Sequence, residues 1–153
     1  MTNRSFWLGC LPFGRDLNSD QTLIFLNSLP TNYNYILDLS DIYAQGKSIE
    51  IISSIISRLP ENITISLKLG LEYYFDKSFF SVRPINWKPS QLRSSYEQYL
   101  NLIPPVRLHS IQLHALPDKA DSRYSAINCL KSICKSHPNL LLGISNIEKD
   151  EYI

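Results

Sequence analysis

The stretch YNYILDLSDIYAQGKSIEIISSIISRLPENITISLKLG, residues 33–70, determines the fold that we predict. It opens with an apolar run over residues 33–39 and closes with a second run, rich in β-branched residues, over residues 63–69. Between the two runs, isoleucines at helical spacing predict a helix over residues 46–59, which Pro60 ends. A strand, a helix and a second strand in this order predict two parallel strands joined by a right-handed crossover.

The same alternation of strand and helix extends over the rest of the chain. Further strands are predicted at residues 6–10, 107–113 and 139–144, and further helices at residues 18–29, at residues 89–102 and after residue 118. We therefore expect one α/β domain over residues 1–153, with five parallel strands and four helices. Strands this apolar are expected to have cover on both faces.

Composition and charge exclude several classes of protein. The chain is 44% hydrophobic and 19% charged, with a net charge of +1, so it can bury a core and has no reason to bind nucleic acid or a membrane surface. We expect no membrane span, because no apolar run approaches ~18 residues. The N-terminal apolar stretch is too short for a signal peptide, and the three cysteines form no CxxC pair and no metal-binding spacing. These features predict a cytoplasmic protein with reduced thiols and no metal site.

Four residues with acid–base chemistry lie at the ends of predicted strands: Asp38, Tyr43, Lys68 and His114. Barrels of alternating strands and helices build their active sites from such strand ends. Lys68 lies inside an apolar strand and needs a partner carboxylate, for which Asp38 on the neighbouring strand is the candidate. A cation beside Tyr43 favours its phenolate form and suits it to act as a general acid, and His114 could orient a carbonyl oxygen. Each residue alone also has an ordinary structural explanation; their joint placement favours a common site.

Six motifs in chain order resemble those of the aldo-keto reductases, and together they extend over essentially the whole sequence. They are LGC with FG (8–14), YILDLSDIYAQGKSIEII (35–52), ISLKLG (65–70), SVRPINWKPSQLRSSYEQYL (81–100), IQLHALPD (111–118) and LLGISNI (141–147). The resemblance implies a (β/α)8 barrel, of which these motifs match strands one to five. It also implies that Tyr43 protonates the carbonyl oxygen, that Lys68 paired with Asp38 tunes Tyr43, and that His114 orients the carbonyl group.

The resemblance further implies NADPH as the cofactor, bound without a Rossmann domain; the sequence accordingly has no GxGxxG motif. Ser145 and Asn146 would hold the nicotinamide carboxamide, and Gly9 and Cys10 would lie close to the cofactor and substrate. In the family, the aromatic residue that stacks on the cofactor and the loops for its phosphates lie on strands seven and eight, beyond the matched motifs.

The sequence also departs from the family pattern within the motifs. Cys10 replaces a threonine, Leu39-Ser40 replaces Thr-Ala, and Ala44 replaces the glycine that follows the tyrosine. None of these replacements removes one of the four acid–base residues.

Residues 70–88 interrupt the alternation of strand and helix. They are rich in aromatic residues without a clean period, and we predict a long loop here. Tyr73, Tyr74 and Trp87 are candidates for a wall of the substrate site, or alternatively for a cover of the outer rim of the barrel.

Five strands of a barrel leave two open edges and an exposed inner face. A second copy of the chain, a partner chain or a rearranged sandwich would cover them, and we expect a homo-oligomer or such a partner. Three functions stay open: an NADPH-dependent reductase acting on a small carbonyl substrate, a cofactor-independent acid–base enzyme, and a non-catalytic assembly subunit. The reductase is preferred because Ser145 and Asn146 accompany the four acid–base residues.

Overall fold

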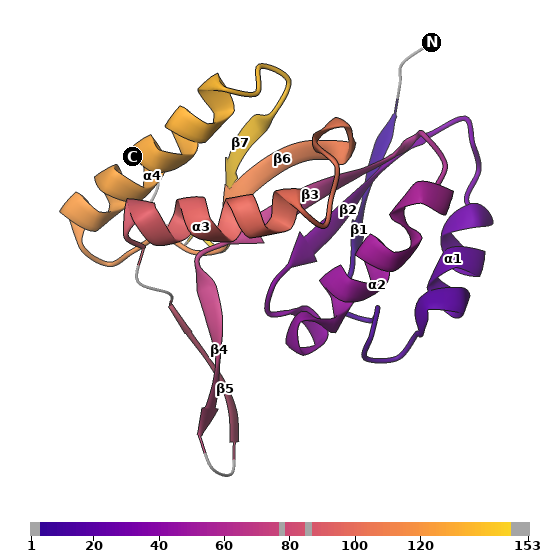
Figure 1. The fold of residues 1–153 in the computed structure, drawn as a ribbon, viewed down its shortest axis with the longest axis horizontal. Coiled ribbons are helices and arrows are strands. Elements are labelled where there is room, and N and C mark those ends of the chain that lie inside the picture. Colours follow the sequence, from indigo (N-terminus) through magenta and orange to yellow (C-terminus); the bar gives the residue numbers. More distant parts are fainter. Residues whose placement is uncertain (1–3, 77–78, 85–86, 148–153) are drawn as a thin grey trace.

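The computed structural model describes residues 4–76, 79–84 and 87–147, and the side chains of these residues outside 72–86. The strands are β1 (Ser5–Gly9), β2 (Asn34–Ser40), β3 (Ile63–Leu69), β4 (Leu71–Asp76), β5 (Phe79–Pro84), β6 (Leu108–Leu113) and β7 (Leu141–Ile144). The helices are α1 (Ser19–Asn27), α2 (Lys47–Ile55), α3 (Pro89–Leu100) and α4 (Ala120–Lys135). Short 3-10 turns lie at η1 (Tyr43–Gly46), η2 (Ile56–Arg58) and η3 (Pro105–Arg107) (Figure 1).

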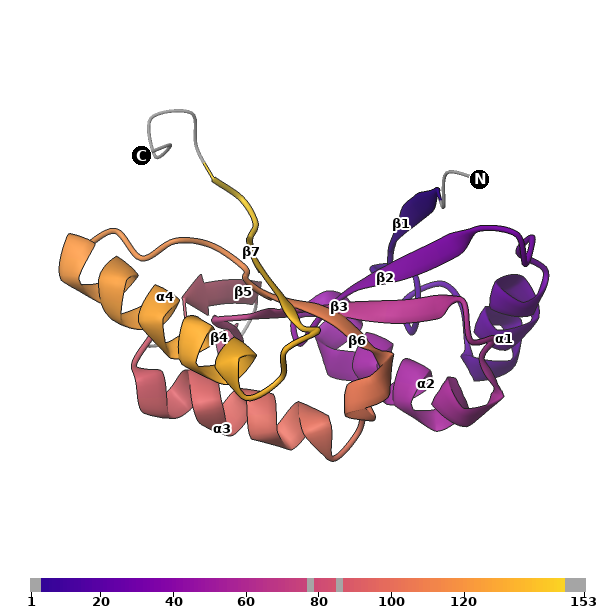
Figure 2. The ribbon, with the colours of Figure 1, turned by 90° about the horizontal axis from the view of Figure 1, so that it is seen from above.

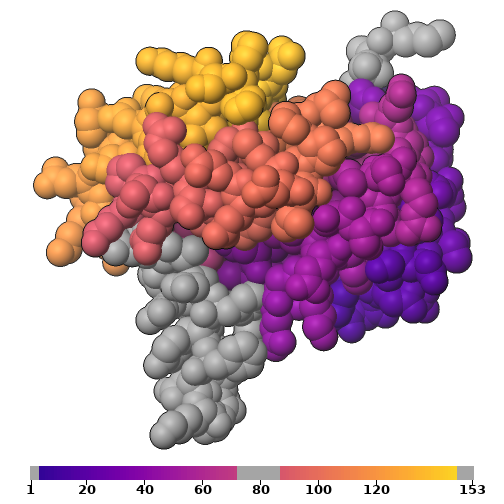
Figure 3. All heavy atoms as spheres, viewed as in Figure 1, coloured from indigo at the N-terminus to yellow at the C-terminus, as the bar shows by residue number. Residues whose placement is uncertain are grey.

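Five strands form one parallel sheet, as predicted, and their order is β1-β2-β3-β6-β7. Each strand of this sheet therefore lies beside the next one along the chain. The sheet is curved, with β1 and β7 rising at its two ends and the four α-helices on its convex side (Figure 2). Seen from the helix side, α2 and α3 lie over the sheet (Figure 3).

The helix boundaries follow local signals in the sequence. Asn18 caps α1, where its side chain accepts a hydrogen bond from the backbone of Gln21, and the Gln21 side chain accepts one from the backbone of Asn18. Pro89 takes the first position of α3, as predicted, because its missing N–H is not needed there.

The prediction of a long loop over residues 70–88 is wrong. β4 and β5 pair as an antiparallel two-stranded sheet that extends away from the main sheet (Figure 1). Aromatic residues follow one another directly in both strands, so the sequence lacks the polar–apolar alternation by which half-buried strands are recognised.

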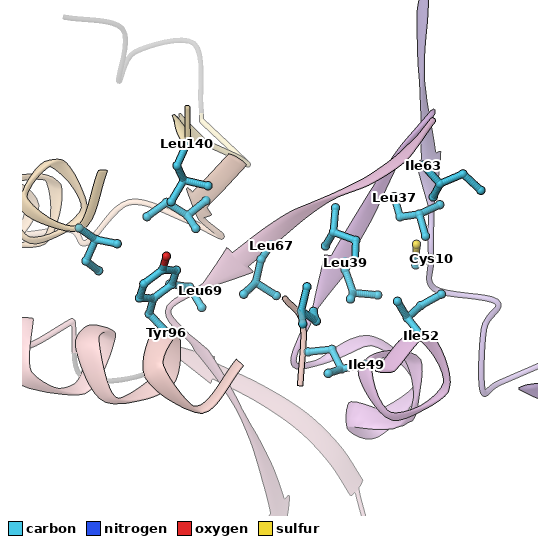
Figure 4. Packing of buried hydrophobic residues seen from close by; sticks show 14 of the residues in the cluster. Cys10, Leu37, Leu39, Ile49, Ile52, Ile63, Leu67, Leu69, Tyr96 and Leu140 are labelled. Atoms are coloured by element: carbon cyan, nitrogen blue, oxygen red, sulfur yellow. The ribbon is translucent and has the colours of Figure 1, made fainter. Parts of the chain in front are cut away.

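The hydrophobic core lies between the main sheet and the helices (Figure 4). Alternate residues of the strands point into it, as period-2 geometry requires. Those of β2 and β3 are Tyr35, Leu37, Leu39, Ile63, Ile65, Leu67 and Leu69, and they meet apolar residues of the helices such as Leu26, Ile52, Ile55, Leu92 and Leu130.

The residues between these core positions give the other face of the sheet a polar character. Ser110 donates a hydrogen bond to the hydroxyl of Ser66 at 2.7 Å, and the amide of Gln112 donates to the same hydroxyl at 2.5 Å. In the described part of the chain, helices cover only the apolar face (Figure 2). Cover of the second face, expected from the sequence, is not supplied by helices of the described residues, and this face holds hydrogen bonds of its own.

Candidate active site

The structure brings the four predicted acid–base residues together at the carboxyl edge of the main sheet. Asp38 lies in β2, Lys68 lies beside it near the end of β3, and His114 directly follows β6. Tyr43 begins the turn η1, which follows β2. Because the strands are parallel, all four positions fall at the same edge, where barrels of this kind build active sites.

Lys68 contacts both the carboxylate and the phenol. Its Nζ atom lies 2.8 Å from Oδ2 of Asp38 and donates a hydrogen bond to the hydroxyl of Tyr43 at 2.7 Å. The ion pair between Lys68 and Asp38 that we expected from the sequence is therefore present, and a direct contact with Tyr43 accompanies it.

The balance of burial and contacts keeps Lys68 charged. Its side chain is buried, with 7% of the residue exposed, and burial alone would lower the pKa of the ammonium. The hydrogen bonds to Asp38 and Tyr43, together with their charges, outweigh burial and raise the pKa of Lys68 above its ordinary value. A positive charge is thus held against the oxygen of Tyr43.

His114 packs against Tyr43 in a setting that favours the neutral imidazole. The two rings meet edge to face with centroids 5.9 Å apart, and 5% of the histidine is exposed. Burial first, and then the nearby charge of Lys68, lower the pKa of His114 to about 4. At neutral pH the imidazole is therefore uncharged.

Two further residues of the site, Ser40 and Asp41, were missed as functional residues in the sequence. The Ser40 hydroxyl lies 3.0 Å from Nδ1 of His114 and donates a hydrogen bond to Oδ1 of Asp41 at 3.0 Å. Ser40 appears in the sequence only as a departure from the resembled motif. Its position two residues after Asp38, on the same face of a strand, was the available signal.

Ser145 and Asn146 follow β7 and reach the same edge of the sheet. The backbone of Ser145 donates a hydrogen bond to the carbonyl of Leu113, and the side-chain amide of Asn146 donates to the carbonyl of His114 at 2.7 Å. Asn146 adopts a left-handed backbone conformation with φ of 51°. These bonds attach both residues to the backbone that carries His114.

Gly9 and Cys10, at the end of β1, differ in what they offer to a ligand. A side chain added at Gly9 would meet no atom within 4 Å, so the space beside it is open. The thiol of Cys10 is fully buried among core residues, and burial, followed by the charge of Asp38, raises its pKa (Figure 4). The backbone N–H of Cys10 donates a hydrogen bond to the carbonyl of Asp38 at 3.1 Å.

Of the three aromatic residues predicted for a substrate wall, the structure describes the side chain of Trp87 alone. The side chains of Tyr73 and Tyr74 lie outside the described part. Trp87 is half-buried and packs against the core, and its indole lies directly over Gly70, which has φ of +104°. The indole Nε1 is buried without a hydrogen-bond partner among the described residues.

Two classes of feature are missing from the described part of the chain. No cluster of histidine, cysteine, aspartate or glutamate in residues 4–76, 79–84 and 87–147 could hold a metal ion. No helix within those ranges is long and apolar enough to cross a membrane.

Comparison with solved structures identifies the fold. A glycerol dehydrogenase from Gluconobacter oxydans superposes with a TM-score of 0.68 at 21% identity, over 95% of this chain and 45% of its own. A putative aldo-keto reductase from Pseudomonas aeruginosa gives 0.69 at 19% identity, over 95% and 56%. This chain has the fold of the aldo-keto reductases. An aldo-keto reductase from Klebsiella pneumoniae, solved in complex with NADPH, gives 0.66 at 15% identity, over 94% and 46%.

The match to the aldo-keto reductase fold covers nearly all of this chain but only part of each solved structure. The chain is covered almost completely, but it spans about half the length of these structures. No protein-family model matches the chain, and no curated protein matches it. At these identities the likeness shows the fold, and the predicted resemblance is confirmed at that level.

Proposed function

We propose that the protein is an NADPH-dependent reductase of the aldo-keto reductase type, acting on a carbonyl group of a small molecule with Tyr43 as general acid. The observation that supports this most directly is the ammonium of Lys68, which contacts both the Tyr43 hydroxyl and the Asp38 carboxylate. A general acid needs a hydroxyl whose proton can leave, and a cation in contact with the oxygen stabilises the resulting phenolate.

Each residue of the site has its own part in the transfer of one proton. Tyr43 donates its hydroxyl proton to the carbonyl oxygen of the substrate, while Lys68 stabilises the negative charge that remains on the phenol oxygen. Asp38 keeps Lys68 in place and charged. His114, whose ring lies against that of Tyr43, orients the substrate at the same oxygen.

The residues around the site fit a nicotinamide cofactor. The carboxamide of a nicotinamide has both donors and an acceptor. Asn146 donates through its amide nitrogen to His114 and so leaves its amide oxygen to accept, while the Ser145 hydroxyl can donate. The open space beside Gly9 would admit the ring. When bound, NADPH supplies the hydride that reduces the carbonyl carbon.

We also propose a cytoplasmic location. The three cysteines are free thiols, which suits a reducing compartment.

Titration of NADPH fluorescence with the purified protein tests the cofactor. Saturable binding in the micromolar range is expected from the proposal. Absence of binding up to millimolar cofactor would refute it and would favour a cofactor-independent enzyme or an assembly subunit.

The Tyr43→Phe variant tests the general acid. We expect kcat to fall by about 10²-fold or more, the usual contribution of a general acid, with unchanged affinity for NADPH. Tyr124→Phe is the matched control, because Tyr124 is exposed on α4, and it should turn over like the wild type. Unchanged turnover in Tyr43→Phe would exclude the assigned role.

A further inference from the structure

A chain of hydrogen bonds leads from Asp41 through Ser40 to His114. Oδ1 of Asp41 and Nδ1 of His114 each lie 3.0 Å from the hydroxyl oxygen of Ser40. Ser40 is fully buried, so no water competes for its single proton. The direction of both hydrogen bonds is consequently decided by the two groups at the ends of the chain.

An ionised Asp41 fixes the chain in one direction. A carboxylate only accepts hydrogen bonds, so the Ser40 hydroxyl must give its proton to Asp41. The Tyr99 hydroxyl and the backbone N–H groups of Ile42 and Asp41 also donate to this carboxylate. Towards His114 the oxygen of Ser40, which also accepts from the backbone N–H of Ile42 at 3.4 Å, can then act only as an acceptor. This places the ring proton of the neutral imidazole on Nδ1 and leaves Nε2 bare.

A protonated Asp41 reverses the chain. Its carboxyl proton is donated to Ser40, and the Ser40 hydroxyl turns to donate to Nδ1 of His114. The ring proton then resides on Nε2. A hydroxyl can transmit this reversal because it donates and accepts through the same atom.

We propose that Asp41 and Ser40 are positioning residues that set which ring nitrogen of His114 carries the proton, so that Nε2 accepts a hydrogen bond when Asp41 is ionised and donates one when Asp41 is protonated. Within residues 4–76, 79–84 and 87–147, Nε2 has no hydrogen-bond partner and is left for a ligand. The consequence for a substrate rests on the proposed function: a carbonyl oxygen needs a donor and is held by His114 only in the second state.

We expect the reversal of the hydrogen bonds in the mildly acidic range. Burial raises the pKa of Asp41 to about 6 against the hydrogen bonds from Ser40 and Tyr99. His114, which faces Lys68 and Tyr43, keeps its pKa near 4 and stays neutral on both sides of the change. Asp38 is paired with Lys68 at 2.8 Å, and in the described part of the chain its side chain makes no hydrogen bond to Asp41, Ser40 or the His114 ring.

The ¹⁵N chemical shifts of the His114 ring in the ligand-free chain test the proposal, since a protonated and a bare ring nitrogen resonate far apart. We expect the proton on Nε2 at pH 5 and on Nδ1 at pH 8, with the midpoint near pH 6. The signals are assigned by their loss in His114→Gln. A ring that keeps its proton on one nitrogen from pH 5 to pH 8 would overturn the proposal.

Three variants test the path of the coupling. Asp41→Asn and Ser40→Ala should each abolish the dependence of the His114 signals on pH in this range, whereas Ser40→Thr keeps a hydroxyl and should retain it. An unchanged transition in Asp41→Asn would also overturn the proposal.

The KM for a carbonyl substrate should change with pH in parallel with the proton on His114. KM for a carbonyl substrate should be lower at pH 5 than at pH 8 in the wild type, and this difference should vanish in Asp41→Asn. The NMR measurement needs no cofactor, so failure of NADPH binding would refute the proposed function without affecting this result. Activity without the tautomer change would refute the inference alone.

Discussion

Among the described residues, Asp38 is the only carboxylate within ion-pair distance of Lys68. Asp38 is largely buried, and its second oxygen, Oδ1, has no hydrogen-bond partner among the described residues. The negative charge therefore depends on Lys68 alone, because a buried charge without a partner is costly.

Removing the ammonium should therefore destabilise the fold as well as the site. We expect Lys68→Met to lower the free energy of unfolding by about 3 kcal/mol, since it leaves Asp38 buried and unpaired. The double variant Lys68→Met/Asp38→Asn should recover part of this loss. Urea unfolding measures both, and equal stability of the single and double variants would contradict the account.

The neutral state of His114 predicts how stability responds to acid. Its pKa is lowered in the folded state from the ordinary 6.5 to about 4, so the folded chain binds the proton less readily than the unfolded chain. The resulting stabilisation is fully present above pH 6.5 and is lost as the pH falls through about 4. Asp41 acts in the opposite direction: its raised pKa adds stability below 3.8, which is lost as the pH rises through about 6.

The variant His114→Gln separates these two contributions, because it removes only the first. We expect the difference in free energy of unfolding between wild type and variant to shrink as the pH falls from 6.5 to 4. Denaturant unfolding at several pH values measures this difference. A constant difference across the range would show that the imidazole is not held neutral by the fold.

The pairing of Lys68 with Asp38 could be predicted from the sequence, because an ammonium group inside any apolar strand is costly to bury without a carboxylate partner. The roles of Ser40 and Asp41 could not be predicted in the same way. A serine and an aspartate after a strand are ordinary turn residues, and their link to His114 joins positions 74 residues apart in the chain. Only the pairing of β2 with β3, and of β3 with β6, brings these groups into contact.

At the scale of elements, the turn η1 is the most strained part of the described backbone. Ala44 and Gln45 both adopt left-handed conformations, with φ of 48° and 61°, and Gly46 follows with φ of 82°. Side chains with a Cβ disfavour this region by roughly 1–2 kcal/mol each. The resembled motif has glycine at position 44, and the backbone conformation found here gives the physical reason for that preference.

Replacing the first strained residue by glycine should stabilise the protein. We expect Ala44→Gly to raise the free energy of unfolding by about 0.5–1 kcal/mol, the relief of strain less the greater freedom of glycine in the unfolded chain. Ala126→Gly in the middle of α4 is the control and should be destabilising instead. Thermal unfolding measures both, and a loss of stability in Ala44→Gly would refute the strain.

The elements themselves were predicted well where one physical signal dominates. Helical spacing, the cap at Asn18 and the proline at position 89 located the helices, and apolar runs, β-branched in the case of β3, located the strands of the main sheet. The hairpin of β4 and β5 was not predicted, because its consecutive aromatic residues show no alternation of polar and apolar positions. Its existence depends on pairing between its own two strands, which composition does not reveal.

At the scale of the whole molecule, apolar side chains remain exposed on the two edge strands. Trp7 on β1 is 52% exposed and Leu141 on β7 is 55% exposed, with Phe6 and Leu142 also exposed beside them. Edge strands with free backbone groups and apolar side chains are sites of association. We propose that a second copy of the chain or a partner covers them.

Mass measurement in solution checks this proposal. We expect the wild type to exceed the 17.6 kDa of one chain, and Trp7→Lys/Leu141→Lys to shift toward that mass. Val106→Lys is the control, because Val106 is exposed in η3, outside the edge strands, and should leave the mass unchanged. A wild type that remains at 17.6 kDa without a partner would contradict association between copies.

The serine-lined face of the sheet bears on the order of events during folding. Because Ser66, Ser110 and Gln112 bond to one another, this face tolerates water before anything covers it. Every strand of the main sheet also pairs with the strand that precedes or follows it in that sheet along the chain, so no pairing spans more than one crossover connection. The five strands and their helices can therefore form before anything covers the concave side of the sheet.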